Sequence, residues 1–185
     1  MRRVYFVTSN PEKQVEAKLV LEPRSIQIQL LQQTIIEPLS VDLPIVATSK
    51  VVEAYRRYHI PVFVEHGGLY IEALKGLPGC LSKLMFTALK GEICDLIRPG
   101  QDRTAIARSL VAFCDGRRIH LFTGEVNGTI SVTPKGARDY YYDTVFIPEG
   151  HSQTFAEMSI EDKTRISHVK QAYEAFASHL TTARV

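Results

Sequence analysis

The stretch RTAIARSLVAFCDGRRIHLFTGEVNGTISV, residues 103 to 132, decides what kind of sheet this chain builds. Two runs of strand-forming residues flank Asp115 and Gly116, and an Asp-Gly pair between such runs is typical of a tight β-hairpin. Since a hairpin joins antiparallel strands, the centre of the chain predicts the antiparallel part of a sheet.

The N-terminal third predicts strands that alternate with helices. VYFVTS (residues 4–9) is an apolar strand-like run, and Asn10 as N-cap with Pro11 at the first helical position begins a helix. SIQIQLLQQ (25–33) alternates like a strand, residues 43–58 have helical spacing, and VFVE (62–65) is a buried strand that ends at Glu65 and His66. Together with the hairpin, this order predicts an α/β fold, a mixed and twisted sheet flanked by helices, in a single domain over residues 1–185.

The rest of the chain adds shorter elements. Residues 81–97 read as helical with a break near Gly91, and YYYDTVF (140–146) predicts a short strand after the TPKG turn. A last helix is expected from Ser159 onward, with one apolar stripe made of Ile166, Val169, Tyr173, Phe176 and Leu180.

Composition restricts the class of function. Of the 185 residues 45% are hydrophobic and 23% charged, and the net charge is +2, so no overall field favours nucleic acid or an acidic membrane. No apolar run is long enough to cross a bilayer, and the N-terminus has no cleavable leader pattern, so we expect a cytoplasmic protein. Cys80, Cys94 and Cys114 are odd in number and scattered, which predicts reduced core thiols.

The hexapeptide TSNPEK, residues 8–13, lies where a strand passes into a helix. Free backbone N–H groups at a helix start favour an anion, and Lys13 in the first turn adds a full positive charge, which indicates a phosphate site. The alternative is that Thr8, Ser9 and Asn10 only cap the helix. The spacing of a Walker loop is missing.

Three acids form a second cluster of candidates: Glu37 in the IIEP loop, Glu65 at the end of the VFVE strand and Asp143 in YYYD. Carboxylates at neighbouring strand ends could hold Mg²⁺ together with nucleotide phosphates. Taken singly, each acid is typical of a solvated loop. Lys50 and Lys163, each on an expected helix, are open to both interpretations, surface or ligand-binding.

In order, these motifs resemble the inosine triphosphate pyrophosphatase family, Ham1-like enzymes that act on non-standard purine nucleoside triphosphates. The resemblance extends over nearly the whole chain, from TSNPEK and the Glu37-Pro pair through VEHGGLYIEALKGLPG, LFTGEVNGTIS, YYYDTVFIPEG and TFAEMS to EDKTRISH. It implies an elongated mixed sheet with a second lobe, a nucleotide cleft between the two lobes, and a homodimer.

The resemblance also implies hydrolysis between the α- and β-phosphates, with Mg²⁺ required, or with Mn²⁺ or another divalent metal in its place. His66, Glu65 and Lys50 would be catalytic, and Glu37 with Glu65 would serve the metal. The residues that would bind substrate are Thr8, Asn10, Lys13 and Lys163 for the phosphates, and Tyr140, Tyr142, Asp143, Ser167 and His168 for the purine.

Three positions depart from the family pattern. His66 stands where the family has a second acid, Tyr141 where it has a glycine, and Val169 where it has an arginine. A neutral His66 could still accept a proton from water, whereas Tyr141 would fill space left for the base. Two hypotheses follow. The first is a pyrophosphatase with an altered substrate range or mechanism, and the second is a nucleotide-binding protein without turnover that acts as a sensor or partner subunit.

Overall fold

The computed structural model describes residues 2–137 and 141–182, and over these the chain forms one seven-stranded mixed sheet. The strand order is β2-β1-β3-β5-β6-β7, and β4 pairs with β3 outside this path. The strands are β1 (Arg2–Val7), β2 (Ile26–Leu31), β3 (Val62–Ile71), β4 (Pro78–Gly79), β5 (Thr104–Cys114), β6 (Ile119–Ile130) and β7 (Phe146–Pro148).

Both parts of the predicted sheet are confirmed. β1 is parallel to β2 and to β3, and the connections run through the helices α1 (Pro11–Leu21) and α2 (Leu43–Tyr58). β5 and β6 form the antiparallel hairpin, with Cys114 opposite Ile119. At its turn the Asp115 carboxylate accepts hydrogen bonds from the backbone N–H groups of Arg117 and Arg118, and Gly116 adopts φ +97°.

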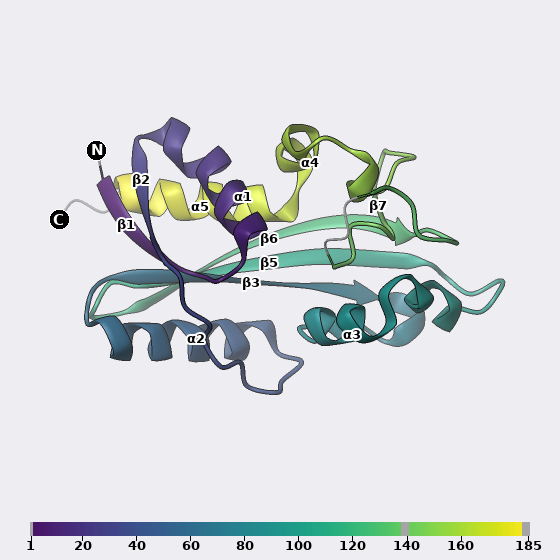
Figure 1. Ribbon diagram of the computed structural model, residues 1–185, viewed down its shortest axis with the longest axis horizontal. Coiled ribbons are helices and arrows are strands. Elements are labelled where there is room, and N and C mark those ends of the chain that lie inside the picture. The colour runs from purple at the N-terminus through teal and green to yellow at the C-terminus, as the bar shows by residue number, and fades with distance from the viewer. Residues whose placement is uncertain (1, 138–140, 183–185) are drawn as a thin grey trace.

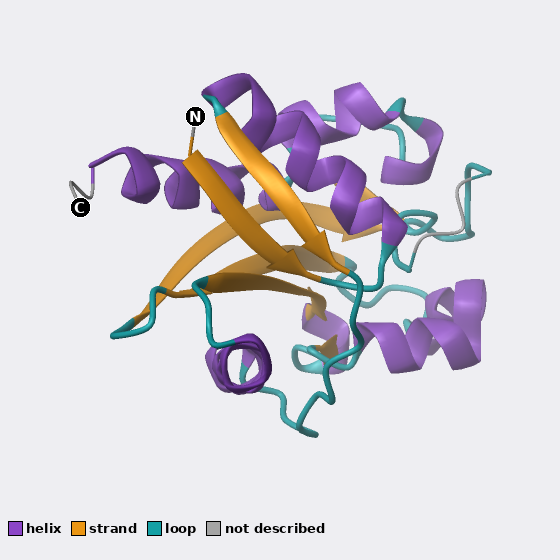
Figure 2. Cartoon of the chain, turned by 60° about the vertical axis from the view of Figure 1, so that its left-hand side comes forward, coloured by secondary structure: helices purple, strands orange, loops and turns teal. Residues whose placement is uncertain are grey.

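Helices cover both faces of the sheet (Figures 1 and 2). α1 and α5 (His168–Thr182) lie over one face, α2 and α3 (Ser82–Leu89) over the other, and α4 (Ile160–Ile166) is on the side of α1 and α5. Under α5 the rings of Phe6 and Phe63 stack with centroids 4.4 Å apart, and Tyr173 and Phe176 pack against them. The apolar stripe predicted for the last helix is therefore core from Val169 to Leu180. Ile166 is not part of it, because it packs against a different core cluster.

Two predicted strand boundaries are wrong. β3 does not end at Glu65 and His66, because ladder pairing with β5 continues from Val62 to Ile71 through both glycines. Gly68 fits there since a Cβ would lie 2.4 Å from the carbonyl oxygen of Gly79. The YYYDTVF segment is a turn over residues 141–145 and becomes a strand only at Phe146, while Tyr140 lies outside the described residues.

The last helix is two helices. Ser167 has ψ 151°, so α4 ends there, and its hydroxyl oxygen accepts a hydrogen bond from the backbone N–H of Lys170 at the start of α5. A serine that caps a new helix competes with continuation of the old one. The predicted break near Gly91 is confirmed, as α3 gives way to a 3-10 helix over Lys90–Leu96.

The three cysteines are free and buried, as predicted. Within residues 2–137 and 141–182 none of the helices has both the length and the apolar composition that crossing a membrane requires.

Candidate active site

The candidate site is a cleft where the sheet splits. β1 pairs with β3 only at Val62 and Phe63, and β4 joins β3 only at Leu69 and Tyr70, so the intervening edge of β3 faces a cavity of about 320 Å³. This is within the size range of small-molecule sites. Its walls come from seven segments: the end of β1 with the start of α1, the loop before α2, α2 itself, β3, the start of α3, the turn at residues 141–143, and the α4–α5 region.

The split explains how Glu65 and His66 share one cavity. Successive side chains of a strand point to opposite faces of a sheet, and these two residues are adjacent on β3. Both nevertheless line the cleft, because the open edge of the strand makes both faces accessible from the same side. Their side chains therefore have different partners.

Glu65 faces the start of α1. Its Oε2 lies 2.6 Å from Nζ of Lys13, which also donates to the backbone carbonyl of Glu65 at 3.2 Å, and its Oε1 accepts from the hydroxyl of Ser109 at 2.7 Å. Burial opposes ionisation of both partners, yet the contact lowers the pKa of Glu65 and raises the pKa of Lys13. The pair is charged at neutral pH.

The N-terminal turn of α1 combines the two interpretations of TSNPEK. Oδ1 of Asn10 accepts from the backbone N–H groups of Glu12 and Lys13, which is the predicted cap, and Oγ1 of Thr8 accepts from the N–H of Asn10. Thr8, Asn10 and Lys13 nevertheless line the cleft. A helix start and a lysine therefore face the cavity, and both attract anions.

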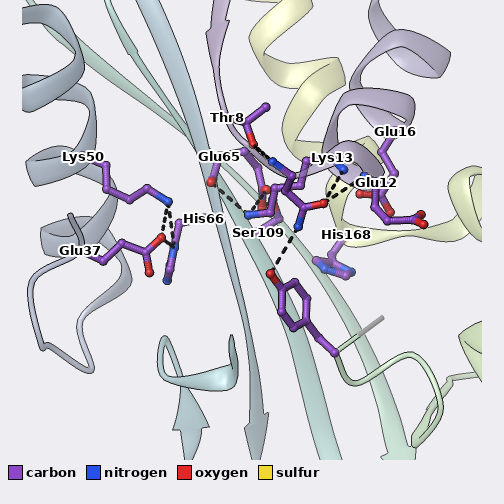
Figure 3. A network of polar contacts seen from close by, with 12 residues as sticks. Thr8, Glu12, Lys13, Glu16, Glu37, Lys50, Glu65, His66, Ser109 and His168 are labelled. Atoms are coloured by element: carbon purple, nitrogen blue, oxygen red, sulfur yellow. Dashed lines mark hydrogen bonds and ion pairs between the residues drawn. The ribbon is translucent and has the colours of Figure 1, made fainter. Parts of the chain in front are cut away.

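His66 faces α2, where it meets Lys50 and Glu37 (Figure 3). Nζ of Lys50 is 2.7 Å from Oε1 of Glu37 and 3.4 Å from Nδ1 of His66, and Nδ1 is 3.6 Å from the same Glu37 oxygen. The other ring nitrogen, Nε2, is 3.2 Å from the carbonyl oxygen of Cys80. A carbonyl only accepts hydrogen bonds, so Nε2 carries the proton and neutral His66 directs the lone pair of Nδ1 toward Lys50.

Burial keeps His66 neutral. It lowers the pKa of the ring, the contact with Glu37 opposes this effect, and the charges of Lys50 and Lys13 add to it. Burial likewise lowers the pKa of Lys50, with a contribution from Lys13. Although burial opposes it, the contacts with His66 and with the Lys50 ammonium hold the pKa of Glu37 well below its usual range.

At the end of the cleft opposite His66, one buried ammonium group forms ion pairs with two carboxylates. Nζ of Lys163 lies 2.7 Å from Asp143 and 3.0 Å from Glu16, and all three side chains are at most 4% exposed. Burial and the charge of Asp143 raise the pKa of Glu16. Glu16 was not predicted as a site residue, although it follows Lys13 by three positions on α1 and so shares its face.

His168 completes this end. Its Nε2 is 2.9 Å from the hydroxyl of Tyr142, while in the described part of the chain no group hydrogen-bonds to its buried Nδ1. Burial lowers the pKa of His168 to about 3, so the ring is neutral. Nδ1 is thus a polar atom available to a ligand, since buried polar atoms are normally paired.

Other predicted residues have different placements. Ser167 is buried but its hydroxyl bonds within the α4–α5 junction, and it is not part of the cleft wall as described. Tyr140 lies outside the described residues. Tyr141, which was noted only as a departure, lines the cleft, and so does Val169.

The carboxylates do not form a preassembled metal cage. In residues 2–137 and 141–182 no group of three or more His, Cys, Asp or Glu side chains is arranged to hold an ion. Mg²⁺ is usually bound by one or two carboxylates while water and substrate phosphates complete its shell. Glu37 and Glu65, both on the wall near Lys13 and Lys50, fit that arrangement.

Comparison with known proteins gives consistent results. The sequence model of the Ham1 family matches residues 4–179. A dITP/XTP pyrophosphatase of Thermococcus kodakarensis is 38% identical over 96% of this chain and 97% of its own length. An inosine triphosphate pyrophosphatase of Giardia intestinalis is 35% identical over 97% of this chain and 93% of its own. The fold is similar to that of a HAM1 protein from Coxiella burnetii, with a TM-score of 0.85, 23% identity and coverage of 99% and 100%.

Proposed function

Because this chain belongs to the Ham1 family, we propose that it hydrolyses (d)ITP- and XTP-like purine nucleoside triphosphates to the monophosphate and pyrophosphate. The observation that carries the proposal is the arrangement of one cleft: two lysines and a helix N-terminus at one end, and a buried set of hydrogen-bonding groups at the other. This is the order of groups that a triphosphate joined to a purine requires.

The phosphate chain would lie at the end formed by α1 and α2. Backbone N–H groups and the dipole of α1 favour the anion there, and Lys13 and Lys50 supply full charges. In the structure these lysines contact Glu65 and Glu37 at 2.6 and 2.7 Å. Substrate binding therefore exchanges carboxylate contacts of the lysines for phosphate contacts.

His66 would act as the base for the attacking water. Its proton is held on Nε2 by the carbonyl of Cys80, and its lowered pKa keeps it in the accepting form at neutral pH. Nδ1, which lies 3.4 Å from Nζ of Lys50, would accept a proton from water once Lys50 moves to the phosphates. General-base catalysis requires that protonation state at the pH of the reaction. A histidine can therefore stand in for the carboxylate of the family pattern.

A divalent metal, Mg²⁺ or Mn²⁺, would be held by Glu37 and Glu65 with the substrate phosphates. When bound, it neutralises phosphate charge and polarises the phosphorus–oxygen bonds. Lys13 and Lys50, released from the two carboxylates, then position the phosphates by charge.

The purine would enter the other end, where Asp143, Tyr142 and His168 offer hydrogen-bonding groups. Lys163, expected from the sequence at the phosphates, lies at this end too, ion-paired with Asp143. The unpartnered Nδ1 of neutral His168 accepts a hydrogen bond if Nε2 keeps the proton. A site that pairs such groups with one base rejects a base that leaves them unpaired, which is how a 6-oxo purine is separated from a 6-amino purine.

The test is pyrophosphate release from a nucleotide panel. Purified protein is incubated with ITP, dITP, XTP, ATP and GTP in the presence of Mg²⁺ or Mn²⁺, and pyrophosphate and monophosphate are quantified. We expect release with the 6-oxo non-standard nucleotides and much less with ATP. Measurable nucleotide binding without any release would favour the alternative, a binding protein without turnover.

The same proposal includes the setting of the protein. We expect a homodimer that acts in the cytoplasm, where nucleotide pools are and where its three cysteines stay reduced. Light scattering after size-exclusion chromatography measures the mass, and a value close to the 20.8 kDa of a single chain would contradict the dimer.

A further inference from the structure

We propose that Ser109 is a positioning residue for Glu65 and holds this carboxylate in place when Lys13 leaves it for the phosphates. The inference rests on the proposed function and adds to it a residue that acts through Glu65 and does not itself contact the nucleotide. Ser109 lies on β5, is 0% exposed and is not part of the cleft wall as described. Its influence on the site therefore depends on the side chain that it contacts.

The carboxylate of Glu65 has a different partner at each oxygen (Figure 3). Oε2 lies 2.6 Å from Nζ of Lys13, and Oε1 accepts a hydrogen bond of 2.7 Å from the hydroxyl of Ser109. A hydroxyl that donates to a carboxylate at this distance forms a strong, charge-assisted hydrogen bond. Lys13 reaches the carboxylate with a long and flexible stem, whereas Ser109 is a short side chain on an interior strand of the sheet. Of the two partners, Ser109 is the one with a fixed position.

The pairing of β3 with β5 explains how a short side chain reaches Glu65. Ser109 is directly opposite Gly67, and Gly67 is two residues from Glu65 on the same face of β3. A Cβ at position 67 would lie 3.2 Å from Oε1 of Glu65 and 3.1 Å from the carbonyl oxygen of Arg108, so a larger residue there would crowd the carboxylate. Because glycine leaves this space open, the hydroxyl of Ser109 reaches the residue that is diagonal to it across the two strands.

Substrate binding would affect the two oxygens of Glu65 differently. When Lys13 exchanges its contact with Glu65 for a phosphate, the carboxylate becomes available to the divalent metal. The contact with Ser109 persists, because the two residues are on paired strands and are 0% and 4% exposed. Groups that hydrogen-bond to a ligating carboxylate fix its orientation, and their loss typically weakens metal binding about 10- to 100-fold. Ser109 should therefore determine how much metal the site requires, while the phosphate contacts of the lysines stay unchanged.

The experiment measures binding of inorganic tripolyphosphate by calorimetry at a series of Mg²⁺ concentrations. In Ser109→Ala we expect the Mg²⁺ concentration for half-maximal binding to rise about tenfold or more. Ser131→Ala is the matched control, because Ser131 is also buried and its hydroxyl donates at 2.7 Å to the carbonyl of Thr133, outside the cleft wall as described. This control should have the Mg²⁺ dependence of wild type.

Two further variants separate positioning from a general distortion of the site. Ser109→Cys fills the buried position and retains only a weak S–H donor, so we expect a smaller rise than in Ser109→Ala. In Glu65→Gln the carboxylate is absent, so adding Ser109→Ala should cause no further rise in the Mg²⁺ concentration.

Three outcomes would overturn the inference. These are an unchanged Mg²⁺ dependence in Ser109→Ala, an equal rise with and without Glu65→Gln, and wild-type binding of tripolyphosphate that does not depend on Mg²⁺. Because tripolyphosphate binding needs no turnover, the proposed function is tested separately. A wild-type protein that shows the expected Mg²⁺ dependence but releases no pyrophosphate from the nucleotide panel would contradict the proposed function alone.

Discussion

Replacing Lys163 by methionine tests the electrostatics of the cleft directly. The ammonium is 2% exposed and contacts two carboxylates at 2.7 and 3.0 Å, from Asp143 and Glu16, which are as deeply buried. Methionine keeps most of the volume but removes the ammonium that both buried acids contact. Breaking a buried ion pair in this way costs about 3 to 5 kcal/mol of unfolding free energy.

The assay is urea and thermal unfolding at pH 8 and at pH 5. For a chain of this size the expected loss lowers the melting temperature by about 6 to 20 °C. Without the ammonium, burial raises the folded-state pKa of both acids above their unfolded values. Their unfavourable contribution is then present above the folded pKa and is relieved as the pH falls through it. The loss of unfolding free energy caused by Lys163→Met should therefore be smaller at pH 5 than at pH 8.

Glu16→Gln is the matched variant for this experiment. It removes the second carboxylate and leaves Lys163 paired with Asp143, so we expect little change in stability at pH 8. Combined with Lys163→Met, it should recover part of the lost free energy, because one buried acid then remains in place of two. A cost below about 1 kcal/mol for Lys163→Met at pH 8 would refute the reasoning, since surface pairs have that value.

Three further predictions concern catalysis and pH. Lys13→Met should raise KM for ITP at least about tenfold, because it removes a charge-assisted contact with phosphate. Lys18→Met, exposed on the same helix, is the control and should leave KM unchanged. Equal KM values for the two variants would contradict the phosphate site. His66→Ala should lower kcat by about 10²-fold or more. Because burial lowers the pKa of His66, kcat of the wild type should fall only below pH 6.5, the ordinary pKa of histidine. A fall in kcat that begins above pH 6.5 would argue against His66 as the base. His168 has a folded pKa of about 3 and an unfolded value near 6.5, so its contribution is complete above pH 6.5 and is lost as the pH falls toward 3. At pH 5 the loss is about 2 kcal/mol, and urea unfolding of His168→Gln should show a correspondingly shallower pH dependence.

The sequence predicts those parts of the fold that local chemistry determines. Asp115 and Gly116 require a tight turn, and the flanking strands then pair in the register that the turn sets. Asn10 and Pro11 begin α1 because one supplies a capping oxygen and the other lacks an N–H that would be unsatisfied there.

Long-range contacts explain what local patterns could not indicate. Two glycines suggest the end of β3, but continuous pairing with β5 carries the strand through them. Ser167 falls inside a continuous helical pattern in the sequence, although its hydroxyl accepts from the backbone N–H of Lys170 and so caps a new helix. Glu16 lies within an ordinary helical pattern, and its role depends on Lys163, almost 150 positions away in sequence.

The net charge of the cleft wall affects which cellular phosphates the protein binds only weakly. Among the described residues, its ionisable side chains include four ammonium groups and four carboxylates, namely Lys13, Lys50, Lys83 and Lys163 with Glu16, Glu37, Glu65 and Asp143. With all eight charged, they sum to no net charge, so the wall offers no net attraction to orthophosphate or to a nucleotide that carries no cation. Abundant cellular phosphates would then occupy the site poorly, whereas a metal-complexed triphosphate brings its own positive charge to offset that of its phosphates. We expect orthophosphate at physiological concentration to inhibit the protein only weakly.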